Sequence, residues 1–372
     1  MDMKKVVEEY GNKVTIGVFG SHSAEEVGMA AKAAGMETVV VCQKGRDVLY
    51  TKYNKHLFDH TLMLDKFSDL AEKDAQEKLL ELNTIFIPNR SFSVYVGYDN
   101  IEQRFAVPMY GNRFILRAEE RTAPRNQYWL LEQGNIRIPR EFKSPDKIDR
   151  LCIVKVQQKQ NPLERAFFYP TTPQEYEEQS KKLLENETIS EEGLEKSRIE
   201  EFVLGPRYNA NFHSYALKDV FGNFDFVGFD DRIQTDLTGL LNLPAAEQLK
   251  VKVMPKNEEV GHKGMTMRES LKPMIYDAAE KFIKIVEKEY PPGMIASFAL
   301  QGAMPYSEAG RPEFVIFDVS PRIPGSPCVG PTSPEMRRLS LKHKQAIESQ
   351  LDLSVMEIKY AAENERLKEI VT

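Results

Sequence analysis

Apolar runs and helically spaced segments alternate through the first third of the chain. Short apolar stretches at 14–19, 38–42 and 84–88 predict strands, and the spacing of apolar residues at 24–34 and 70–82 predicts helices. Strands that are apolar on both faces are typical of a parallel sheet covered by helices on both sides. The pattern therefore predicts an α/β layer built on a parallel sheet at the beginning of the chain.

Beyond residue 122 the pattern changes to a mixture of strands and longer helices. A stretch rich in Glu and Lys separates two apolar strands and is interpreted as a solvated helical face. Later, alternating positions predict antiparallel strands that turn back on one another. The expected elements are a helix at 129–133, strands at 152–156 and 199–203 around a helical stretch at 176–198, antiparallel strands within 209–228, a helix at 268–290, strands at 295–300 and 314–319, and helices from 334 onward.

Composition narrows the class of protein. The chain has 372 residues, 41% of them hydrophobic and 28% charged, as expected for a globular protein of two or three packed units. Its formal net charge of −6 argues against a nucleic-acid binder that relies on a basic face. The charged start and the lack of an apolar run of ~18 residues argue against a signal peptide and a membrane span. We therefore expect a cytoplasmic protein that binds neither nucleic acid nor membrane.

The first candidate site is the turn Gly20-Ser21-His22-Ser23, between a predicted strand and a predicted helix. Backbone N–H groups in the first turn of a helix lack partners within the helix, so such a turn suits an anion such as a phosphate. The polar turns at 43–46 and 89–91 also follow strands, at the edge where parallel sheets bind ligands. The alternative is structural: Ser23 and Glu26 form a capping box, Gly20 serves the turn, and His22 is exposed.

Two further groups of residues follow strands in ways that suggest chemistry. Gln301 and Asp318 end neighbouring strands and can hold a divalent cation between them, while Arg322 can neutralise a transferring phosphoryl or acyl phosphate. The alternative is a structural ion pair between Asp318 and Arg322. Lys155 leaves a strand and can meet nucleotide phosphates, and Glu200-Glu201 begin a strand that can bind adenosine.

Several sequence blocks spread along nearly the whole chain carry a family resemblance. In this order they make the chain similar to the archaeal synthetases of 5-formaminoimidazole-4-carboxamide ribonucleotide (FAICAR), the PurP family of ATP-grasp ligases in purine biosynthesis. These enzymes use ATP and formate to formylate 5-aminoimidazole-4-carboxamide ribonucleotide (AICAR). The blocks are Gly20-Ser21-His22-Ser23-Ala24, Ile87-Pro88-Asn89-Arg90-Ser91-Phe92, Gly111-Asn112-Arg113, Ile199-Glu200-Glu201-Phe202-Val203-Leu204-Gly205, Arg268-Glu269-Ser270-Leu271, Pro291-Pro292-Gly293-Met294-Ile295 and Phe317-Asp318-Val319-Ser320-Pro321-Arg322.

The resemblance implies a fold, ligands and site residues. It implies an α/β ATP-grasp protein: a Rossmann-like pre-ATP-grasp domain over 1–122, a small ATP-grasp (lid) subdomain over 123–204, and a large ATP-grasp subdomain with C-terminal helices over 205–372. ATP and Mg²⁺ or Mn²⁺ are the expected cofactors, the ribonucleotide and formate are the other expected small-molecule partners, and we expect a homo-oligomer. The residues expected at the sites are Lys155, Glu200, Glu201 and Val203 for ATP, His22, Ser91 and His262 for the ribonucleotide, Gln301 and Asp318 for the metal, and Arg322 for catalysis.

Three positions depart from the family pattern. The segment after Lys155 contains no glycine where the family has a glycine-rich loop over the ATP phosphates, and it offers Lys159 and Arg165 instead. Gln301 stands where a glutamate is expected, and an amide is a poorer Mg²⁺ ligand than a carboxylate. His262 replaces an expected asparagine. Two alternatives to the formate ligase therefore stay open: an ATP-grasp carboxylate–amine ligase with another substrate, and a non-catalytic nucleotide-binding paralogue.

Overall fold

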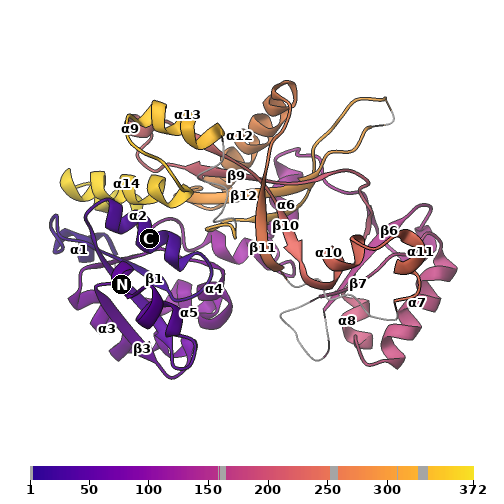
Figure 1. The fold of residues 1–372 in the computed structure, drawn as a ribbon, viewed down its shortest axis with the longest axis horizontal. Coiled ribbons are helices and arrows are strands. Elements are labelled where there is room, and N and C mark those ends of the chain that lie inside the picture. The colour runs from indigo at the N-terminus through magenta and orange to yellow at the C-terminus, as the bar shows by residue number, and fades with distance from the viewer. Residues whose placement is uncertain (1–2, 158, 160–164, 252–258, 308, 326–333) are drawn as a thin grey trace. The chain divides into compact units, whose positions relative to one another are not determined.

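A computed structural model describes residues 3–157, 159, 165–251, 259–307, 309–325 and 334–372 (Figure 1). The chain forms two compact units, each assembled from segments that are distant in the sequence. Unit 1 comprises Met1–Ile136, Arg207–Gly302 and Asp318–Thr372, and unit 2 comprises Arg137–Pro206 and Ala303–Phe317. The predicted boundaries at 122 and 204 cut the chain differently, and the three-part division stays a prediction.

The first sheet of unit 1 is the parallel sheet that the sequence predicts. All neighbouring strands are parallel, in the order β3-β2-β1-β4. Every residue of β1 is buried, which explains its uninterrupted apolar run. Strand β3 was not predicted, because it lies at an edge and alternates buried and exposed positions. The strands are β1 (Thr15–Phe19), β2 (Glu37–Gln43), β3 (His60–Leu64) and β4 (Thr84–Phe86).

Helices cover both faces of this sheet with separate apolar cores. On one face, Val18 and Val40 pack with side chains of α2 (Ala24–Ala33) and α14 (Gln350–Glu363). On the other face, Val39 and Val41 pack with α3 (Lys73–Glu81) and α4 (Arg90–Val96). The carboxyl ends of β1 and β4 thus lead into helices α2 and α4, which places the polar turns 20–23 and 89–91 beside each other.

The second sheet of unit 1 has five strands in the order β11-β10-β9-β12-β13. Strands β9, β10 and β11 are antiparallel neighbours. Helix α12 (Lys272–Glu289) packs on the sheet by placing Phe282 over Phe298 of β12, with ring centroids 5.7 Å apart. The strands are β9 (Arg207–Ser214), β10 (Phe224–Gln234), β11 (Glu259–Met265), β12 (Ala296–Ala303) and β13 (Val315–Ser320), the last two passing from one unit into the other.

Unit 2 is an antiparallel sheet with helices on one face. Its strands β5 (Glu141–Phe142), β6 (Cys152–Gln157), β7 (Arg165–Phe168) and β8 (Arg198–Glu201) have the order β5-β8-β6-β7. Val154, Val156 and Ile199 pack in a core with Leu183 of helix α7 (Pro173–Glu185). Because side chains alternate along a strand, Lys155 and Glu200 point to the opposite face of the sheet.

The remaining elements refine the predicted helices. The stretch predicted at 70–82 divides into η3 and α3, and that at 176–198 into α7 and α8. The helix predicted from 268 begins as η6 and becomes α-helical at Lys272, where a proline occupies its first turn. The other helices are α1 (Met3–Glu8), η1 (Leu49–Tyr53), η2 (Lys55–Leu57), η3 (Phe67–Ala71), α5 (Tyr98–Gln103), η4 (Ile115–Glu119), α6 (Gln127–Gln133), η5 (Pro145–Lys147), α8 (Glu191–Glu195), α9 (Lys218–Phe221), α10 (Thr235–Leu241), α11 (Ala245–Gln248), η6 (Glu269–Leu271), α12 (Lys272–Glu289), α13 (Pro334–His343) and α15 (Leu367–Ile370). In the described ranges, no helix combines the length and the apolar character that crossing a bilayer requires.

Candidate functional site

The turn after β1 is held in shape by the segment after β4. Asn89 caps helix α4, because its side chain accepts a hydrogen bond from the Phe92 N–H at 3.1 Å. The same side chain donates to the carbonyls of Phe19, at 3.2 Å, and His22, at 2.9 Å. Ser91 Oγ donates to Ser21 Oγ at 2.8 Å. The two polar turns therefore form one rigid rim at the carboxyl ends of β1 and β4.

The alternative interpretation of this turn as a capping box is wrong. Ser23 lies at the N-terminus of α2 in a left-handed conformation, with φ of 63°, and its side chain makes no capping hydrogen bond. Glu26 is buried and interacts with Ser349 instead, and burial raises the pKa of Glu26 to about 7. The first turn of α2 thus keeps its backbone N–H groups unengaged by a Ser23 cap, which fits an anion cradle.

His22 is a neutral imidazole beside charged groups. Burial lowers the pKa of His22 to about 4, and the positive charge of Arg322 adds to the effect. A Cβ atom at Gly325 would lie 2.7 Å from His22 Nε2 and 3.0 Å from Glu259 Oε1. Both side chains therefore approach the same point, and only glycine leaves room for them there.

Arg322 is bound by Glu119 and not by Asp318, so the predicted alternative of an Asp318–Arg322 ion pair is wrong. Arg322 donates to the two carboxylate oxygens of Glu119 at 2.6 and 3.3 Å, in a forked arrangement. Arg90 lies 3.2 Å from the same carboxylate. Although burial raises the pKa of Glu119, the charges of Arg322 and Arg90 lower it below its usual value. Glu119 thus holds two guanidinium groups, of which that of Arg322 is close enough to His22 to lower its pKa.

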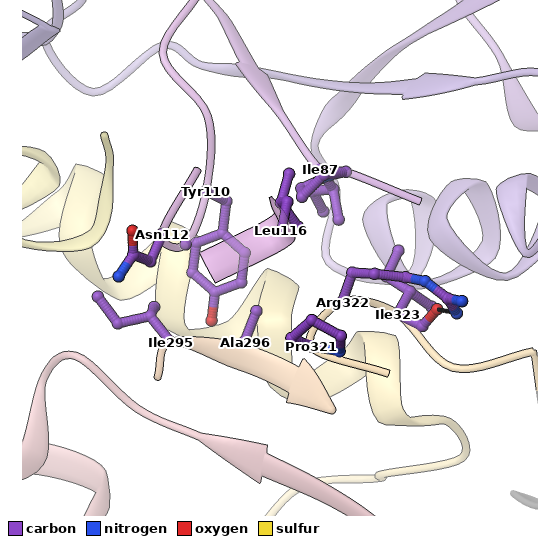
Figure 2. A pocket seen from close by; sticks show the side chains of 11 residues that line it. Ile87, Tyr110, Asn112, Leu116, Ile295, Ala296, Pro321, Arg322 and Ile323 are labelled. Atoms are coloured by element: carbon purple, nitrogen blue, oxygen red, sulfur yellow. Dashed lines mark hydrogen bonds between the residues drawn. The ribbon is translucent and has the colours of Figure 1, made fainter. Parts of the chain in front are cut away.

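A small cavity lies behind Arg322 (Figure 2). Its volume is about 10 Å³, room for the centre of one water molecule. Most of its lining is apolar, including Ile87, Leu116 and Ile295. The cavity is too small for any part of a nucleotide.

The two predicted metal ligands are both engaged by arginines. The Gln301 side-chain oxygen accepts a hydrogen bond from Arg232 at 2.9 Å, and its nitrogen donates to Ser320 Oγ at 2.9 Å. Asp318 lies 3.3 Å from Arg121 and is 25% exposed. Within the described part of the chain, no three His, Cys, Asp or Glu side chains are grouped to hold a metal ion.

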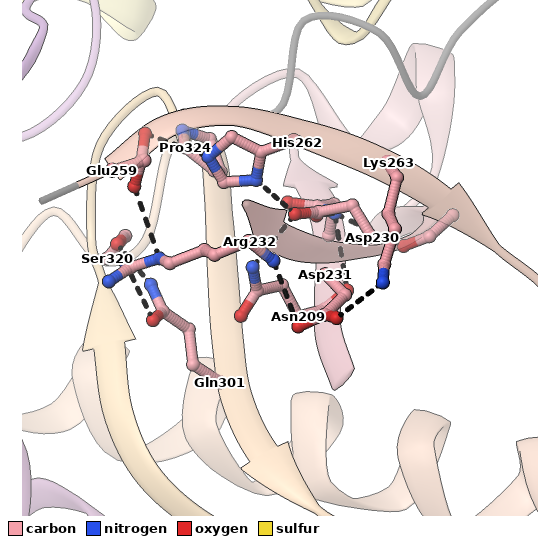
Figure 3. A network of polar contacts seen from close by, with 12 residues as sticks. Asn209, Asp230, Asp231, Arg232, Glu259, His262, Lys263, Gln301, Ser320 and Pro324 are labelled. Atoms are coloured by element: carbon pink, nitrogen blue, oxygen red, sulfur yellow. Dashed lines mark hydrogen bonds and ion pairs between the residues drawn. The ribbon is translucent and has the colours of Figure 1, made fainter. Parts of the chain in front are cut away.

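His262 lies in a network of alternating charges on β10 and β11 (Figure 3). Its Nδ1 contacts Asp230, and its Nε2 lies 2.8 Å from Glu259 Oε1. Glu259 Oε2 lies 3.2 Å from Arg232 Nε. Although burial lowers the pKa of His262, Asp230 and Glu259 raise it to about 9, so the ring is an imidazolium at pH 7. The network therefore places a positive His262 and a neutral His22 on the two sides of Glu259.

The predicted ATP residues lie in unit 2. Lys155 Nζ donates to Glu200 Oε2 at 2.6 Å, and both side chains are buried. Glu201 lies 2.9 Å from Arg137, and Val203 is the second residue after the end of β8. The sheet thus brings Lys155, Glu200 and Glu201 onto neighbouring strands.

The glycine-free segment after Lys155 is described only in part, because residues 158 and 160–164 lie outside the described residues. Lys159 forms an ion pair with Glu187 at 2.9 Å, and Arg165 begins β7. How this segment meets a nucleotide stays a prediction.

Comparisons with known proteins bear on this arrangement. Two family profiles match, one described as "Protein of unknown function (DUF1246)" over residues 16–142 and one as "Domain of unknown function (DUF1297)" over residues 175–372. The "5-formaminoimidazole-4-carboxamide-1-(beta)-D-ribofuranosyl 5'-monophosphate synthetase" of Methanothermobacter thermautotrophicus is 33% identical over 372 residues, covering 99% of this chain and 97% of that protein. The protein of the same name from Methanopyrus kandleri is 34% identical and covers 87% of each chain. The chain belongs to the FAICAR synthetase family.

Solved structures confirm the fold of this FAICAR synthetase-family chain. The "IMP biosynthesis protein PurP" from Thermococcus kodakaraensis superimposes with a TM-score of 0.68 at 22% identity, covering 96% of this chain and 100% of that one. An ADP complex of N5-carboxyaminoimidazole ribonucleotide synthetase gives a TM-score of 0.59 at 12% identity, covering 94% and 78%. The predicted α/β ATP-grasp fold is thus confirmed. The prediction of a ligase is confirmed by the curated relatives, which are named synthetases.

Several residues of the site were not predicted from the sequence. Asn89 was identified as part of the polar turn 89–91, but its capping role was not, although an asparagine before an apolar helix is a typical N-cap. Glu119 gives no such signal, since it is one of several charged residues in an ordinary segment. Asp230 and Glu259 depend on strand pairing between β10 and β11, and β11 carries too many glycines to be predicted.

Proposed function

We propose that this chain catalyses the ATP- and formate-dependent formylation of the 5-amino group of AICAR, which yields FAICAR. The observation that carries the proposal is the 33% identity, over 99% of the chain, to a curated relative named for this product. The geometry of unit 1 supports it, because a helix N-terminus, a neutral imidazole and two guanidinium groups lie together there.

The ribonucleotide is assigned to the rim formed by the turns 20–23 and 89–91. Its phosphate would meet the first turn of α2, which attracts anions through its N–H groups and dipole. His22 and Ser91 would contact the ribonucleotide, and His262 belongs to the same cluster through Glu259. Arg322, held by Glu119, would balance the negative charge that develops when the acyl group is transferred.

ATP is assigned to the face of the unit 2 sheet that carries Lys155 and Glu200, with Glu201 and Val203 beside it. When bound with Mg²⁺, ATP would supply the phosphoryl group that activates formate. Lys155 is already paired with Glu200, so a nucleotide phosphate would share its ammonium group with this carboxylate. The buried pair would hold the lysine in a fixed position for that contact.

Of the two residues assigned to the metal, Asp318 is better suited to bind Mg²⁺ than Gln301. Mg²⁺ commonly binds one or two carboxylates together with phosphate oxygens, and Asp318 is partly exposed. The oxygen of Gln301 already accepts from Arg232, whose positive charge would repel a cation. Asp318 would therefore be the principal ligand, and Gln301 a weak one.

The test is a reconstitution with every component omitted in turn. The chain is incubated with ATP, Mg²⁺, formate and AICAR. The release of ADP is measured, and the mass of the product is determined by mass spectrometry. ADP release that requires both formate and AICAR supports the proposal. Release with another carboxylate in place of formate would favour the ligase with a different substrate, and nucleotide binding without release would favour the non-catalytic paralogue. We also propose a homo-oligomer, which light scattering of the purified chain would test.

A further inference from the structure

Both ring nitrogens of His262 lie close to carboxylates. Asp230 contacts Nδ1, and Glu259 lies 2.8 Å from Nε2. The His262 side chain is 4% exposed and that of Asp230 is fully buried, whereas that of Glu259 is 35% exposed. The polar atoms of His262 therefore point into the protein, and Glu259 is the member of this group that reaches the surface of the site.

Glu259 is held from two sides. Its Oε1 faces His262 and its Oε2 lies 3.2 Å from Arg232 Nε. Asp230 in turn accepts from Asn209 at 2.8 Å and from Asn211 at 2.6 Å, so His262 itself is anchored to two strands. Although burial raises the pKa of Glu259, His262 and Arg232 lower it, and the group is a carboxylate at pH 7. A carboxylate held in one position by two cations is a pre-oriented hydrogen-bond acceptor.

Glu259 lies between two groups of residues that are assigned to ligands. Oε1 of Glu259 and Nε2 of His22 lie within 3.0 Å of one point above Gly325, which puts Glu259 beside the phosphate rim. On its other side, Arg232 connects Glu259 to Gln301, and Gln301 donates to Ser320 of β13, the strand that also carries Asp318 (Figure 3). A group bound by Glu259 would therefore lie between the residues assigned to the ribonucleotide and those assigned to the metal.

We propose that Glu259 is a specificity-determining residue that accepts a hydrogen bond from the reacting amino group of the ribonucleotide, and that His262 is a positioning residue that orients Glu259. The inference rests on the proposed function and deepens it. An ionised carboxylate only accepts hydrogen bonds, so it selects a substrate that presents an N–H donor at this place. A ligand without that donor leaves the carboxylate without its hydrogen bond and binds less well.

The test compares two ligands on matched variants. Calorimetric titration measures the affinity for AICAR and for imidazole-4-carboxamide ribonucleotide, which lacks the 5-amino group. For the parent chain we expect AICAR to bind on the order of tenfold more tightly. Glu259→Ala is expected to remove this preference, and Glu259→Gln to reduce it. Lys263→Gln is the control, because Lys263 neighbours His262 on the same strand but is 61% exposed and pairs with Asp231.

His262→Asn separates positioning from simple structural support. Asparagine is long enough to bond with Asp230 but too short to hold Glu259, so the preference for AICAR should fall by severalfold while affinity for the analogue stays the same. A general loss of stability would lower both affinities together. An unchanged ratio in Glu259→Ala, with normal AICAR binding by the parent, would overturn this inference alone. Failure of the parent to bind either ribonucleotide would overturn the proposed function and the inference with it.

Discussion

The two units treat their buried charges in different ways. In unit 2, the buried Glu200 pairs with both Lys155 and Arg198, and all three residues lie on the adjacent strands β6 and β8 of one sheet. In unit 1, Glu119 is also shared between two cations, Arg322 and Arg90, but these three residues come from three separate segments of the chain. Glu259 pairs with His262 and Arg232 on the neighbouring strands β10 and β11.

The difference lies in what fixes the partners. The pairing of β6 with β8 sets Ile153 opposite Glu200 and so brings Lys155 within reach, which makes this ion pair a consequence of strand register. Glu119, Arg322 and Arg90 of unit 1, in contrast, come from three separate segments that only the tertiary fold brings together. Loss of Lys155 in unit 2 should therefore mainly cost stability, whereas loss of Asp318 or His22 in unit 1 should mainly change turnover or binding.

The largest effect is expected from Asp318→Asn in unit 1. If Asp318 holds Mg²⁺ against phosphate, turnover should fall on the order of 100-fold. The unfolding free energy should change by less than about 1 kcal/mol, because the ion pair with Arg121 is partly solvated. Initial rates at saturating Mg²⁺ and denaturant titration measure the two quantities. A stability loss with unchanged turnover would make Asp318 a structural residue.

Lys155→Met tests the opposite behaviour in unit 2. It leaves the buried Glu200 with Arg198, 2.9 Å away, as its remaining partner, and should lower the unfolding free energy by about 3 kcal/mol. The double variant Lys155→Met, Glu200→Met removes both charges and should recover most of that loss. Chemical denaturation of the parent, the single variant and the double variant measures the three unfolding free energies. Equal stability of the single variant and the parent would contradict the contrast between the units.

The charge of His262 in unit 1 should be detectable in the pH dependence of the unfolding free energy. Its pKa is raised from 6.5 to about 9 in the folded chain, so its contribution to stability is complete below pH 6.5 and is lost as the pH rises through 9. The parent should lose about 2 kcal/mol of unfolding free energy between pH 7 and pH 10 relative to His262→Asn. Parallel curves for the two proteins would show that His262 is not charged.

His22→Ala probes the phosphate rim directly. Because the N–H groups of α2 remain, we expect a partial loss of nucleotide affinity, about 1–2 kcal/mol, and little change for the nucleoside without phosphate. Ser23→Ala is the control and should have no effect on helix stability, since Ser23 makes no capping bond. Equal affinity of the parent for nucleotide and nucleoside would exclude the rim as a phosphate site.

The smallest effect is expected from Gln301→Glu. Arg232 would pair with the new carboxylate, so the Mg²⁺ concentration that supports half-maximal turnover should shift by less than about threefold. Combining it with Arg232→Gln should release the carboxylate and tighten the Mg²⁺ dependence further. Strong tightening by Gln301→Glu alone would show that Arg232 does not control this position.

The sequence predicted those helices and strands whose own pattern of apolar residues shows which positions are buried. The apolar runs of β1 and β2 and the amphipathic α12 needed no tertiary information, because each shows the periodicity of its own element. Strand β11 was missed because its sequence, Glu-Val-Gly-His-Lys-Gly-Met, has two glycines and no alternation, and only pairing with β10 makes it a strand.

The sequence identified several residues of the candidate site, but it did not predict which side chains they contact. Asp318 and Arg322 were identified as polar residues at a strand end, but Arg322 binds Glu119 and Asp318 binds Arg121, and neither partner is near in sequence. His262 was identified through its family position, while its engagement by Asp230 and Glu259 depends on the register of β10 and β11. Long-range electrostatic pairing is the information that a linear pattern lacks.

The way the chain leaves and re-enters unit 2 has a consequence for biosynthesis. Residues 137–206 emerge from the ribosome before residues 303–317, which complete the same unit. The two segments are joined by hydrogen bonds: the Ile316 N–H donates to the Arg137 carbonyl at 2.9 Å, and the Met304 N–H donates to the Pro206 carbonyl at 3.0 Å. About a hundred further residues must therefore be translated before unit 2 can close. Truncated nascent chains that stop before residue 303 would expose an unfinished unit 2 to proteases and chaperones.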